Sequence, residues 1–409
     1  MELLSVDTVE EVKAKLSKAT SHKVLPTVKL AATEALGYVL AQQMDSPLNI
    51  PDFRRSTVDG YAVMAKDTWG ADESTPVFLE CVDEVEMGAA AGRKLQAGEC
   101  IYVPTGGMLP EGANACVMVE YCELFTATSV AIYTSVAEGS SVVEIGEDLK
   151  VGEVVLQKGT RLEPGDIAAL SAIGVTEVLV YKQLSVTIIS TGDELVVPGA
   201  KKEVGQVYDI NTYGLQAMAI KQHFVINEAC IICDDEELLR LKVKQAMQTS
   251  DLILVSGGSS QGKKDVTKKV LDEVSVPGVF THGLALKPGK PTILGYNQQT
   301  DTILVGLPGH PVAAMLVFEL VVLAYYREQL AIKKDFTLSA MLETNLAGAP
   351  GKTTCQLVEV IDTEERYIAR PIFGKSGLIS ILSKANGYIL IERNQEGIKA
   401  GEQVNVHLL

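Results

Sequence analysis

Several short turns, each next to an apolar run, carry the side chains best suited to chemistry in this chain of 409 residues. The turn "SGGSSQGKKD" follows the apolar run "DLILV". This turn can offer N–H groups and hydroxyls to an oxyanion at a helix start, from Ser256, Gly257, Gly258 and Ser260. The turn also comes close to the P-loop pattern G-x-x-x-x-G-K-[ST], but Lys264 stands where a hydroxyl should bind magnesium. An anion site, a P-loop and a plain turn into a helix all stay open.

Two further turns carry cations and prolines. "LALKPGKPTILG" supplies Lys287 and Lys290 on a stretch stiffened by Pro and Gly, which can hold two positive charges near a phosphate. An exposed turn with solvated lysines explains it equally well. "GLPGHPVAA" closes a strand with Pro308 and starts a helix with Pro311, and a tight turn accounts for it without any function.

Acidic and amide side chains follow other apolar runs. "STGDEL" places Glu194 after the run "VTIIS". "YDINTYG" places Asp209 and Asn211 at a predicted helix start, where both residue types are common N-caps. "TVDGYAV" resembles a hairpin with Asp59-Gly60 as its turn. None of these residues indicates catalysis by itself.

The remaining polar candidates are also ordinary by local sequence. Thr105 precedes two glycines in "VPTGGMLPEG", and Asp148 lies in "GEDL". The pair Cys230 and Cys233 has the spacing of a metal or redox pair, but it lies in a strand-like run, where residues three apart face opposite ways. We therefore expect structural thiols.

From Leu184 onward, strand and helix patterns alternate, which predicts a parallel sheet covered by helices. The predicted strands are "SVTIIS", "VINEACII", "DLILVS" and "DTILVGLPG", and the predicted helices are "NTYGLQAMAIKQHF", "DEELLRLKVKQAMQT", "KDVTKKVLDEV" and one starting near His310. Ligands bind such sheets at the carboxyl ends of the strands. The turns described above fall there, so residues 183–330 are predicted to form an α/β ligand-binding domain.

The other segments have different patterns. Helical spacing in "TVEEVKAKLSKA" and "TVKLAATEALGYVLAQ" predicts two helices, and Pro164 suits the first turn of a third. We expect a discontinuous N-terminal helical domain from residues 1–50 and 142–182. Short strand-like runs with Gly and Pro predict an inserted β domain over 51–141 and a C-terminal β domain over 331–409.

Composition narrows the function classes. The net charge of −16 disfavours nonspecific nucleic-acid binding, which needs a basic surface. The most apolar stretch, 312–326, is shorter than the roughly 20 residues of a membrane span and contains Glu319. The amino terminus lacks the pattern of a signal peptide, and seven scattered Cys fit reduced thiols. A cytoplasmic location is expected, without nucleic-acid or membrane partners.

The chain contains eight motifs whose sequences and order along the chain resemble those of the molybdopterin molybdenumtransferases, which insert molybdate into molybdopterin. They are "PDFRRSTVDGYAV", "TGGMLPEGANACVMVE", "GEDLKVGEVVLQKGTRL", "STGDELV", "GQVYDINTYGL", "SGGSSQGKKD", "LKPGKP" and "GLPGHPVAA". The resemblance spans essentially the whole chain. It implies a multidomain α/β plus β fold: a helical unit interrupted by a β domain, an α/β pterin-binding domain and a small C-terminal β-barrel-like domain.

The resemblance also implies a reaction and an assembly. Molybdate would be inserted into adenylylated molybdopterin, with Mg²⁺-dependent release of AMP, by a homodimer whose cleft lies between the α/β domain of one subunit and the inserted β domain of the other. Molybdopterin adenylyltransferase and molybdoenzymes would be partners. The catalytic residues implied are Asp59, Thr105, Asp148, Glu194 and Asp265, of which Asp59, Glu194 and Asp265 would hold the metal; Ser256, Gly257, Gly258, Ser260, Lys287, Lys290, Pro308 and Pro311 would bind substrate.

Two departures from the family pattern keep alternatives open. Lys263 stands where relatives tend to be acidic, and His310 replaces an Asn. An ammonium group cannot ligate Mg²⁺ but adds positive charge near phosphates. The alternatives are a tungstate-inserting variant, a non-catalytic pterin-binding or storage protein, and an NTPase that uses the near-P-loop.

Overall fold

The run Ser185–Thr191 forms a strand, β13, that is buried along almost its whole length, as is typical of a strand covered by helices on both faces. The structure is a computed structural model that describes residues 6–257, 266–332 and 337–409. β13 belongs to a six-stranded sheet of order β16-β13-β17-β21-β20-β18. β16, β13, β17 and β21 run parallel, whereas β20 pairs antiparallel with β21 and β18 pairs antiparallel with β20. The other strands are β16 (Val225–Ile232), β17 (Leu252–Ser256), β18 (Pro277–His282), β20 (Ile293–Asn297) and β21 (Thr302–Leu307).

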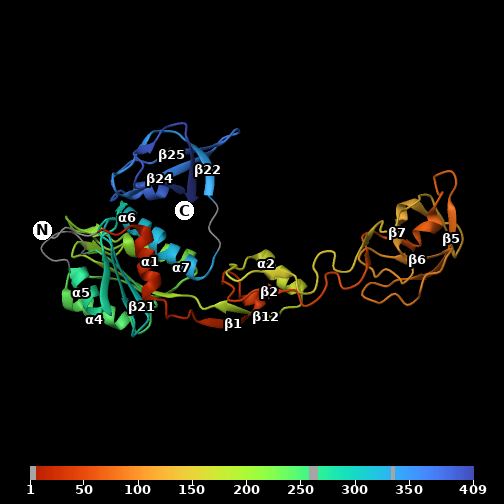
Figure 1. Cartoon of the computed structure of the whole chain (residues 1–409), viewed down its shortest axis with the longest axis horizontal. Helices are drawn as coiled ribbons and strands as arrows, with labels where there is room; N and C mark the ends of the chain where they lie inside the picture. The colour runs from red at the N-terminus through yellow and green to blue at the C-terminus, as the bar shows by residue number, and fades with distance from the viewer. Residues whose placement is uncertain (1–5, 258–265, 333–336) are drawn as a thin grey trace. The chain divides into compact units, whose positions relative to one another are not determined.

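Helices cover both faces of this sheet (Figure 1). One core packs the sheet against α1, α3 and α6, and includes Val12, Leu16 and Leu215. A second core packs the other face against α4 and α5, and includes Leu239 and Val270. The helices are α1 (Val9–Ala19), α3 (Asn211–Lys221), α4 (Glu236–Ala246), α5 (Val266–Val274), α6 (Pro311–Val317) and α7 (Ala324–Gln329), with a π-helical segment, Phe318–Leu323, joining α6 to α7. The predicted α/β architecture is confirmed.

The C-terminal strands close into a small barrel. β24 pairs with both β25 and β26, and the ring continues through β28 and β22 back to β25. The strands are β22 (Thr337–Leu342), β24 (Thr353–Asp362), β25 (Tyr367–Pro371), β26 (Gly387–Ile391) and β28 (Gln403–Leu408). The short strand β19 (Leu286–Lys287) joins β24 from the α/β region, and α8 (Ile379–Lys384) follows β25. The predicted β-barrel-like domain is confirmed.

The second predicted N-terminal helix is wrong. Residues Thr27–Ala31 form strand β1, and only the short 3-10 helix Ala32–Glu34 follows. β1 pairs with β12 (Glu177–Tyr181), and Val39 forms a bridge with Arg161. Pairing with distant segments satisfies the backbone hydrogen bonds of these residues. The apolar residues therefore lie in an extended chain and not in a helix, although their spacing is helical.

The inserted region contains another six-stranded sheet, of order β7-β4-β6-β5-β9-β8. Its strands are β4 (Gly60–Val63), β5 (Val77–Glu84), β6 (Glu99–Val103), β7 (Ala115–Met118), β8 (Cys122–Leu124) and β9 (Ser129–Ile132). Two ribbons adjoin it in the chain: β3 (Arg55–Ser56) with β10 (Val142–Val143), and β2 (Met44–Asp45) with β11 (Val154–Leu156). Helix α2 (Pro164–Ala172) begins at the proline, as predicted.

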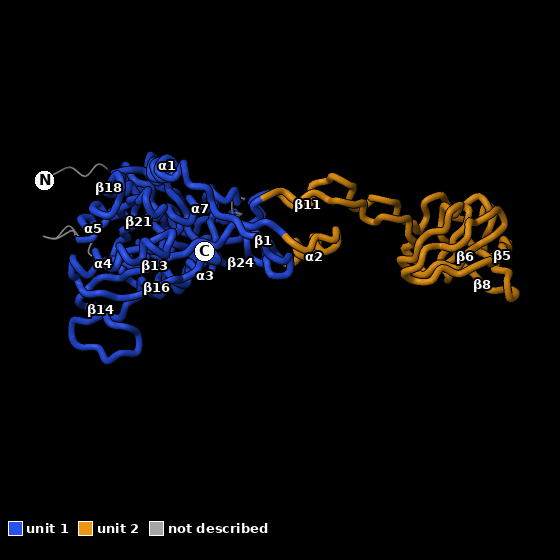
Figure 2. The backbone as a smooth tube through the Cα atoms, turned by 90° about the horizontal axis from the view of Figure 1, so that it is seen from below, with its two compact units in different colours: residues 1–41, 158–163, 178–409 blue, residues 42–157, 164–177 orange. Residues whose placement is uncertain are grey.

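The chain divides into two compact units, coloured separately in Figure 2. Unit 1 comprises residues 1–41, 158–163 and 178–409, and unit 2 comprises 42–157 and 164–177. The finer division into four domains stays a prediction. Across the described ranges, no helix has both the length and the apolar character required to span a membrane.

Candidate functional site

Three parallel strands of unit 1 end in register at one edge of the sheet. Ser190 of β13 pairs with Ser256 of β17, which in turn pairs with Leu307 of β21. Beyond these positions lie the turns that lead to Glu194, Gly257 and Pro308. The structure therefore places the start of three predicted turns together, at the edge where parallel sheets bind ligands.

Asn211 connects the first turn of α3 to two of these strand ends. Its side-chain amide donates to Ser256 Oγ at 2.6 Å and to the Gly309 carbonyl oxygen at 2.9 Å. The expected N-cap role of Asn211 is not observed, because Asn211 is the first helical residue and the N-cap position is Ile210. Asn211 is 9% exposed and acts as a buried connection between β17, β21 and α3.

Asp209 instead accepts a hydrogen bond from the first turn of α3. Its Oδ1 accepts from Thr212 N and from Ser190 Oγ, both at 3.2 Å, and the two hydroxyls of Ser190 and Thr212 lie 2.7 Å apart. Asp209 is 3% exposed. The sequence suggested Asp209 only as a helix cap, and Ser190 and Thr212 carried no separate signal.

Two buried oxygens in this cluster lack a hydrogen-bond partner among the described residues. They are Asp209 Oδ2 and Asn211 Oδ1. Leaving a buried acceptor unpaired costs free energy, so such atoms usually meet a ligand, an ion or water. Asp209 Oδ2 and Asn211 Oδ1 can therefore each accept a hydrogen bond from a bound ligand.

A groove of about 690 Å³ lies beside the cluster. Its walls include Tyr208 and Asp209 from the segment that precedes α3, Tyr213 from the first turn of α3, Met315 from α6 and Leu382 from α8. This volume is in the range of small-molecule sites, which combine apolar and aromatic walls with a few polar groups. The groove can hold a planar heterocycle against tyrosine side chains.

Gly257 is required by the backbone at the end of β17. Its φ is +107°, and an added Cβ would lie 2.2 Å from the Thr191 carbonyl oxygen. Its own carbonyl accepts from Thr267 Oγ1 of α5 at 3.0 Å. Gly258, Ser260 and Asp265, and with them the departure at Lys263, lie outside the described residues.

The two lysines stand on a turn that reaches the same edge. Lys287 and Lys290 are exposed, and the Lys290 carbonyl accepts from the backbone N–H groups of Leu284 and Thr292. The turn leads into β20, whose Ile293 pairs with Gly306 near the carboxyl end of β21. Their ammonium groups are thus available beside this edge.

The turn after β21 carries the remaining unit 1 candidates. The Pro308 carbonyl accepts from Ser256 Oγ at 3.5 Å, and Pro311 is the first residue of α6. His310 Nδ1 lies 2.9 Å from Ser376 Oγ. This contact attaches the C-terminal barrel to the site edge, and no sequence motif indicated Ser376.

Glu194 lies in the exposed turn after β13. Its carboxylate folds over Gly192, where an added Cβ would meet Glu194 Oε2 at 2.8 Å. Its backbone carbonyl accepts from Val207 N, within the small parallel pair β14 (Leu195–Val196) and β15 (Val207–Tyr208). The neighbouring Asp193 Oδ1 accepts from Asp234 N at 3.0 Å.

In unit 2, the structure brings two of the three candidates together. Asp59 Oδ1 accepts from Thr105 N at 2.7 Å, and both residues are exposed. Asp59-Gly60 is not a hairpin turn, because β3 pairs with β10 while β4 pairs with β6 and β7. Asp148 is exposed on another segment, where its N–H donates to the Ile50 carbonyl.

Among the residues that the structure describes, neither a three-residue metal site nor a thiol metal site is seen. Within the described ranges, no group of three or more His, Cys, Asp or Glu side chains is arranged to hold a metal. Of the predicted ligands, Asp59 and Glu194 belong to different units, so this set stays a prediction. Burial raises the pKa of Cys230, which disfavours the thiolate that metal binding needs.

Comparison with known proteins assigns each part of the chain to a family region. Residues 6–174 match the "MoeA N-terminal region (domain I and II)", residues 187–328 the "Probable molybdopterin binding domain" and residues 339–409 the "MoeA C-terminal region (domain IV)". The crystal structure of a molybdopterin biosynthesis moeA protein from Pyrococcus horikoshii matches with a TM-score of 0.82 and 29% identity, covering 99% of this chain and 100% of that one.

Full-length relatives agree. A Methanocaldococcus jannaschii protein named for molybdopterin biosynthesis is 36% identical, over 92% of this chain and 90% of its own length. The molybdopterin molybdenumtransferase of Haemophilus influenzae is 32% identical, over 94% of this chain and 95% of its own length. The chain belongs to the molybdopterin molybdenumtransferase family.

Proposed function

We propose that this protein inserts molybdate into adenylylated molybdopterin and releases AMP in a Mg²⁺-dependent reaction. Family membership assigns the chain to molybdenum cofactor biosynthesis. The observation that best supports the finer proposal is the buried cluster of Asp209 and Asn211, whose hydrogen bonds reach the ends of β13, β17 and β21 beside a groove of about 690 Å³. Two unpaired oxygens and an adjoining pair of tyrosines suit a pterin, and the exposed Lys287 and Lys290 suit its phosphates.

The residues have distinct roles in this proposal. Lys287 and Lys290 bind the phosphate and molybdate oxygens as point charges. Backbone N–H groups after Ser256 orient the same anions. The phosphorus–oxygen bond to AMP breaks while an oxygen from water or molybdate takes its place on phosphorus. No side chain forms a covalent bond.

The exposed carboxylates of Asp59 and Glu194 fit Mg²⁺, which prefers carboxylate oxygens and keeps several waters. The Thr105 N–H holds one Asp59 oxygen in place. When bound, the ion would neutralise charge on the departing phosphate. Asp148 and Asp265 supply further carboxylates in the proposal.

We also propose a homodimer in which one copy supplies Asp59, Thr105 and Asp148 to the α/β edge of the other. Asp59 and Glu194 lie on separate compact units, so variants of these two residues can test whether two copies share one site. Asp59→Ala and Glu194→Ala would each be inactive alone. Mixed by unfolding and reassembly, they should regain about a quarter of wild-type activity, since half the dimers carry one intact site of two. No recovery would contradict a shared site.

The direct test measures AMP release. Purified protein, adenylylated molybdopterin and Mg²⁺ are incubated with molybdate, tungstate or neither, and AMP and active cofactor are quantified. We expect oxyanion-dependent AMP release that chelation abolishes. Asp59→Asn, which keeps an acceptor for Thr105 N but loses the charge, should be as defective as Asp59→Ala.

Each alternative has its own outcome in this assay. Tight pterin binding without AMP release would identify a binding or storage protein. Faster AMP release with tungstate than with molybdate would identify a tungstate-inserting enzyme. ATP hydrolysis without any pterin would favour an NTPase.

A further inference from the structure

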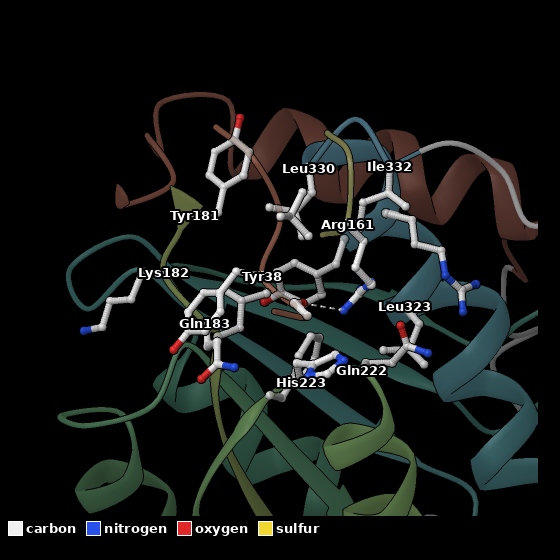
Figure 3. A pocket seen from close by; sticks show the side chains of 16 residues that line it. Tyr38, Arg161, Tyr181, Lys182, Gln183, Gln222, His223, Leu323, Leu330 and Ile332 are labelled. Carbon is white, nitrogen blue, oxygen red and sulfur yellow. Dashed lines mark hydrogen bonds between the residues drawn. The ribbon is translucent and has the colours of Figure 1, made fainter. Parts of the chain in front are cut away.

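A second pocket of unit 1 is too small for a substrate. It lies where Leu184 precedes β13 and Phe224 precedes β16, at the edge of the sheet opposite the candidate site. Figure 3 shows Tyr38, Arg161 and His223 in its wall. Its volume of about 40 Å³ has room for about three waters, at roughly 10–15 Å³ each. The pocket therefore belongs to the packing of these segments.

Unit 2 contains two thiols on neighbouring strands. Cys81 of β5 and Cys100 of β6 are direct partners in the parallel pairing of these strands. Their side chains lie on the same face of the sheet, in one apolar cluster with Leu79 and Val130. Neighbouring strands lie about 4.8 Å apart, and the Cα atoms of disulfide-bonded cysteines are usually about 4.4–6.8 Å apart. The backbone therefore permits a disulfide between Cys81 and Cys100.

The strand pairing is irregular directly after Cys81. Asp83, and not Val82, is the partner of Ile101, so β5 contains a bulge at this point. A bulge bends its strand and redirects the neighbouring side chains. Burial, and then the charge and the hydrogen bond of the neighbouring Cys81 thiol, raise the pKa of Cys100. The two sulfur atoms are thus neighbours in the folded protein.

The other thiols of this sheet are placed differently. Cys122 lies on β8, which β9 separates from β5, and its thiol donates to the Met118 carbonyl at 3.4 Å. Cys116 alternates along β7 with Ala115 and Val117, whose side chains belong to the cluster, so the Cys116 thiol points to the other face. Cys100 is therefore the thiol in register with Cys81.

The two thiols differ in their access to solvent. Cys81 is partly exposed, whereas Cys100 is fully buried. A small oxidant such as hydrogen peroxide therefore reaches Cys81 first. Reversible thiol oxidation usually combines such an accessible cysteine with a second one beside it, which converts the first oxidation product into a disulfide. Cys100 has the position of this second, resolving cysteine.

We propose that Cys81 and Cys100 form a reversible disulfide when hydrogen peroxide oxidises the protein. The Cys81 sulfur attacks the peroxide, so an S–O bond forms, the O–O bond breaks, and the thiol proton leaves with the other oxygen as water. The Cys100 sulfur then attacks the sulfenic acid of Cys81. The S–S bond forms, and the hydroxyl leaves with the Cys100 proton as a second water. The two thiols lose two electrons and the peroxide gains two; a dithiol reverses the bond by exchange.

The disulfide joins β5 to the strand that leads to a candidate site residue. β6 ends at Val103, just before Thr105, whose N–H donates to Asp59. The connection between β5 and β6 approaches the same turn, since a Cβ added to Gly106 would lie 3.8 Å from Met87 Cε. A cross-link here restricts the unfolded chain, so oxidation stabilises unit 2. The disulfide does not depend on the proposed reaction.

The test maps disulfides in the full-length protein by mass spectrometry. The folded protein is treated with hydrogen peroxide, the remaining thiols are alkylated, and the chain is cleaved after glutamate. Cleavage at Glu80, Glu99 and Glu111 puts Cys81 and Cys100 on separate peptides. We expect these two peptides to be linked, and dithiothreitol to separate them. The urea concentration at which unit 2 becomes protease-sensitive should rise on oxidation and return to its starting value on reduction.

Three variants complete the test. Cys116→Ala is the matched control, because it removes a buried thiol of the same sheet, and it should leave the linked peptides unchanged. Cys100→Ala should leave Cys81 as a sulfenic acid, which dimedone labels. If Cys100→Ala is unstable, Cys81→Ala at the partly exposed position should leave Cys100 reduced. Absence of the linked peptides from the folded protein, or a link from Cys81 to Cys122, would overturn the proposal.

Discussion

The Asn211 amide donates to Ser256 Oγ at 2.6 Å, joining two residues 45 positions apart in the chain. The same amide reaches the Gly309 carbonyl, so one side chain fixes the ends of β17 and β21 relative to α3. A site made from turns on separate strands needs such a connection, because each turn alone is free to shift.

Replacing Asn211 tests this connection. Asn211→Ala should cost about 1–3 kcal/mol of stability, because buried partners lose a donor. It should also lower AMP release by at least about 10-fold, because misplaced groups lose catalytic orientation. Asn227→Ala is a matched control, since Asn227 likewise donates to a carbonyl, of Thr249, and to a hydroxyl, of Ser250, at the other end of the sheet. Equal activity losses in both variants would refute the specific role.

Gly257→Ala separates backbone strain from a steric clash. Gly257 and Gly205 both have positive φ, but only at Gly257 would the new Cβ meet backbone, the Thr191 carbonyl at 2.2 Å. Both variants should lose about 1–2 kcal/mol from the left-handed conformation. Only Gly257→Ala should also lose pterin binding, measured by calorimetry. Retained affinity in Gly257→Ala would mean that the turn tolerates displacement.

Gly60→Ala should destabilise unit 2 selectively. An added Cβ would lie 2.0 Å from the Val117 carbonyl oxygen, which belongs to the strand paired with β4. We expect a cost of about 1–3 kcal/mol or more, as for other steric overpacking. Gly92→Ala, where the new Cβ meets nothing within 4 Å, is the control. Protease sensitivity of residues 42–157 provides the measurement; equal sensitivity in both variants would contradict the close packing.

The contact between His310 and Ser376 should couple the barrel to the site edge. A double-mutant cycle with His310→Ala and Ser376→Ala should give a coupling of about 0.5–1.5 kcal/mol, the value of an ordinary hydrogen bond. The quantity to measure is the free energy of substrate binding. Additive single effects would show that the contact does not contribute to binding.

His223 gives stability a pH dependence with a defined sign. Its pKa is below the ordinary value of 6.5 because of burial and Arg161. Between the lowered pKa and 6.5 the unfolded chain binds more protons, so stability falls as pH decreases through this range. His223→Asn should reduce that fall. Urea unfolding at pH 8 and pH 5 checks it, and parallel curves for wild type and variant would exclude the effect.

The sequence predicted the architecture of unit 1 well, for physical reasons. Continuous apolar runs such as β13 and β17 occur where a strand is covered on both faces, and Gly257 marks a turn that needs positive φ. The helix predicted for residues 27–42 was wrong, because apolar residues at helical spacing are also compatible with a short strand. The pairing of β1 with β12 selects the strand.

The details of the site were harder to predict. Asn211 at a helix start looks like a cap in any single sequence, and only the approach of Ser256 and Gly309 reveals its other role. Ser376 has no local motif, since its position beside His310 depends on packing of the barrel. Asp59 and Thr105 are 46 residues apart and meet through backbone pairing of β4 with β6.

The pairing of β3 with β10 has a consequence for the evolution of this chain. Ser56 lies opposite Val142 and Arg55 opposite Val143, so the intervening residues leave and re-enter the ribbon at neighbouring positions. A segment whose two ends are adjacent can be exchanged for an equivalent segment without moving the chain ends to which it is joined. The part of the chain that carries Asp59 and Thr105 can therefore be replaced as one unit by the corresponding segment of a relative, while the rest of the protein is kept unchanged.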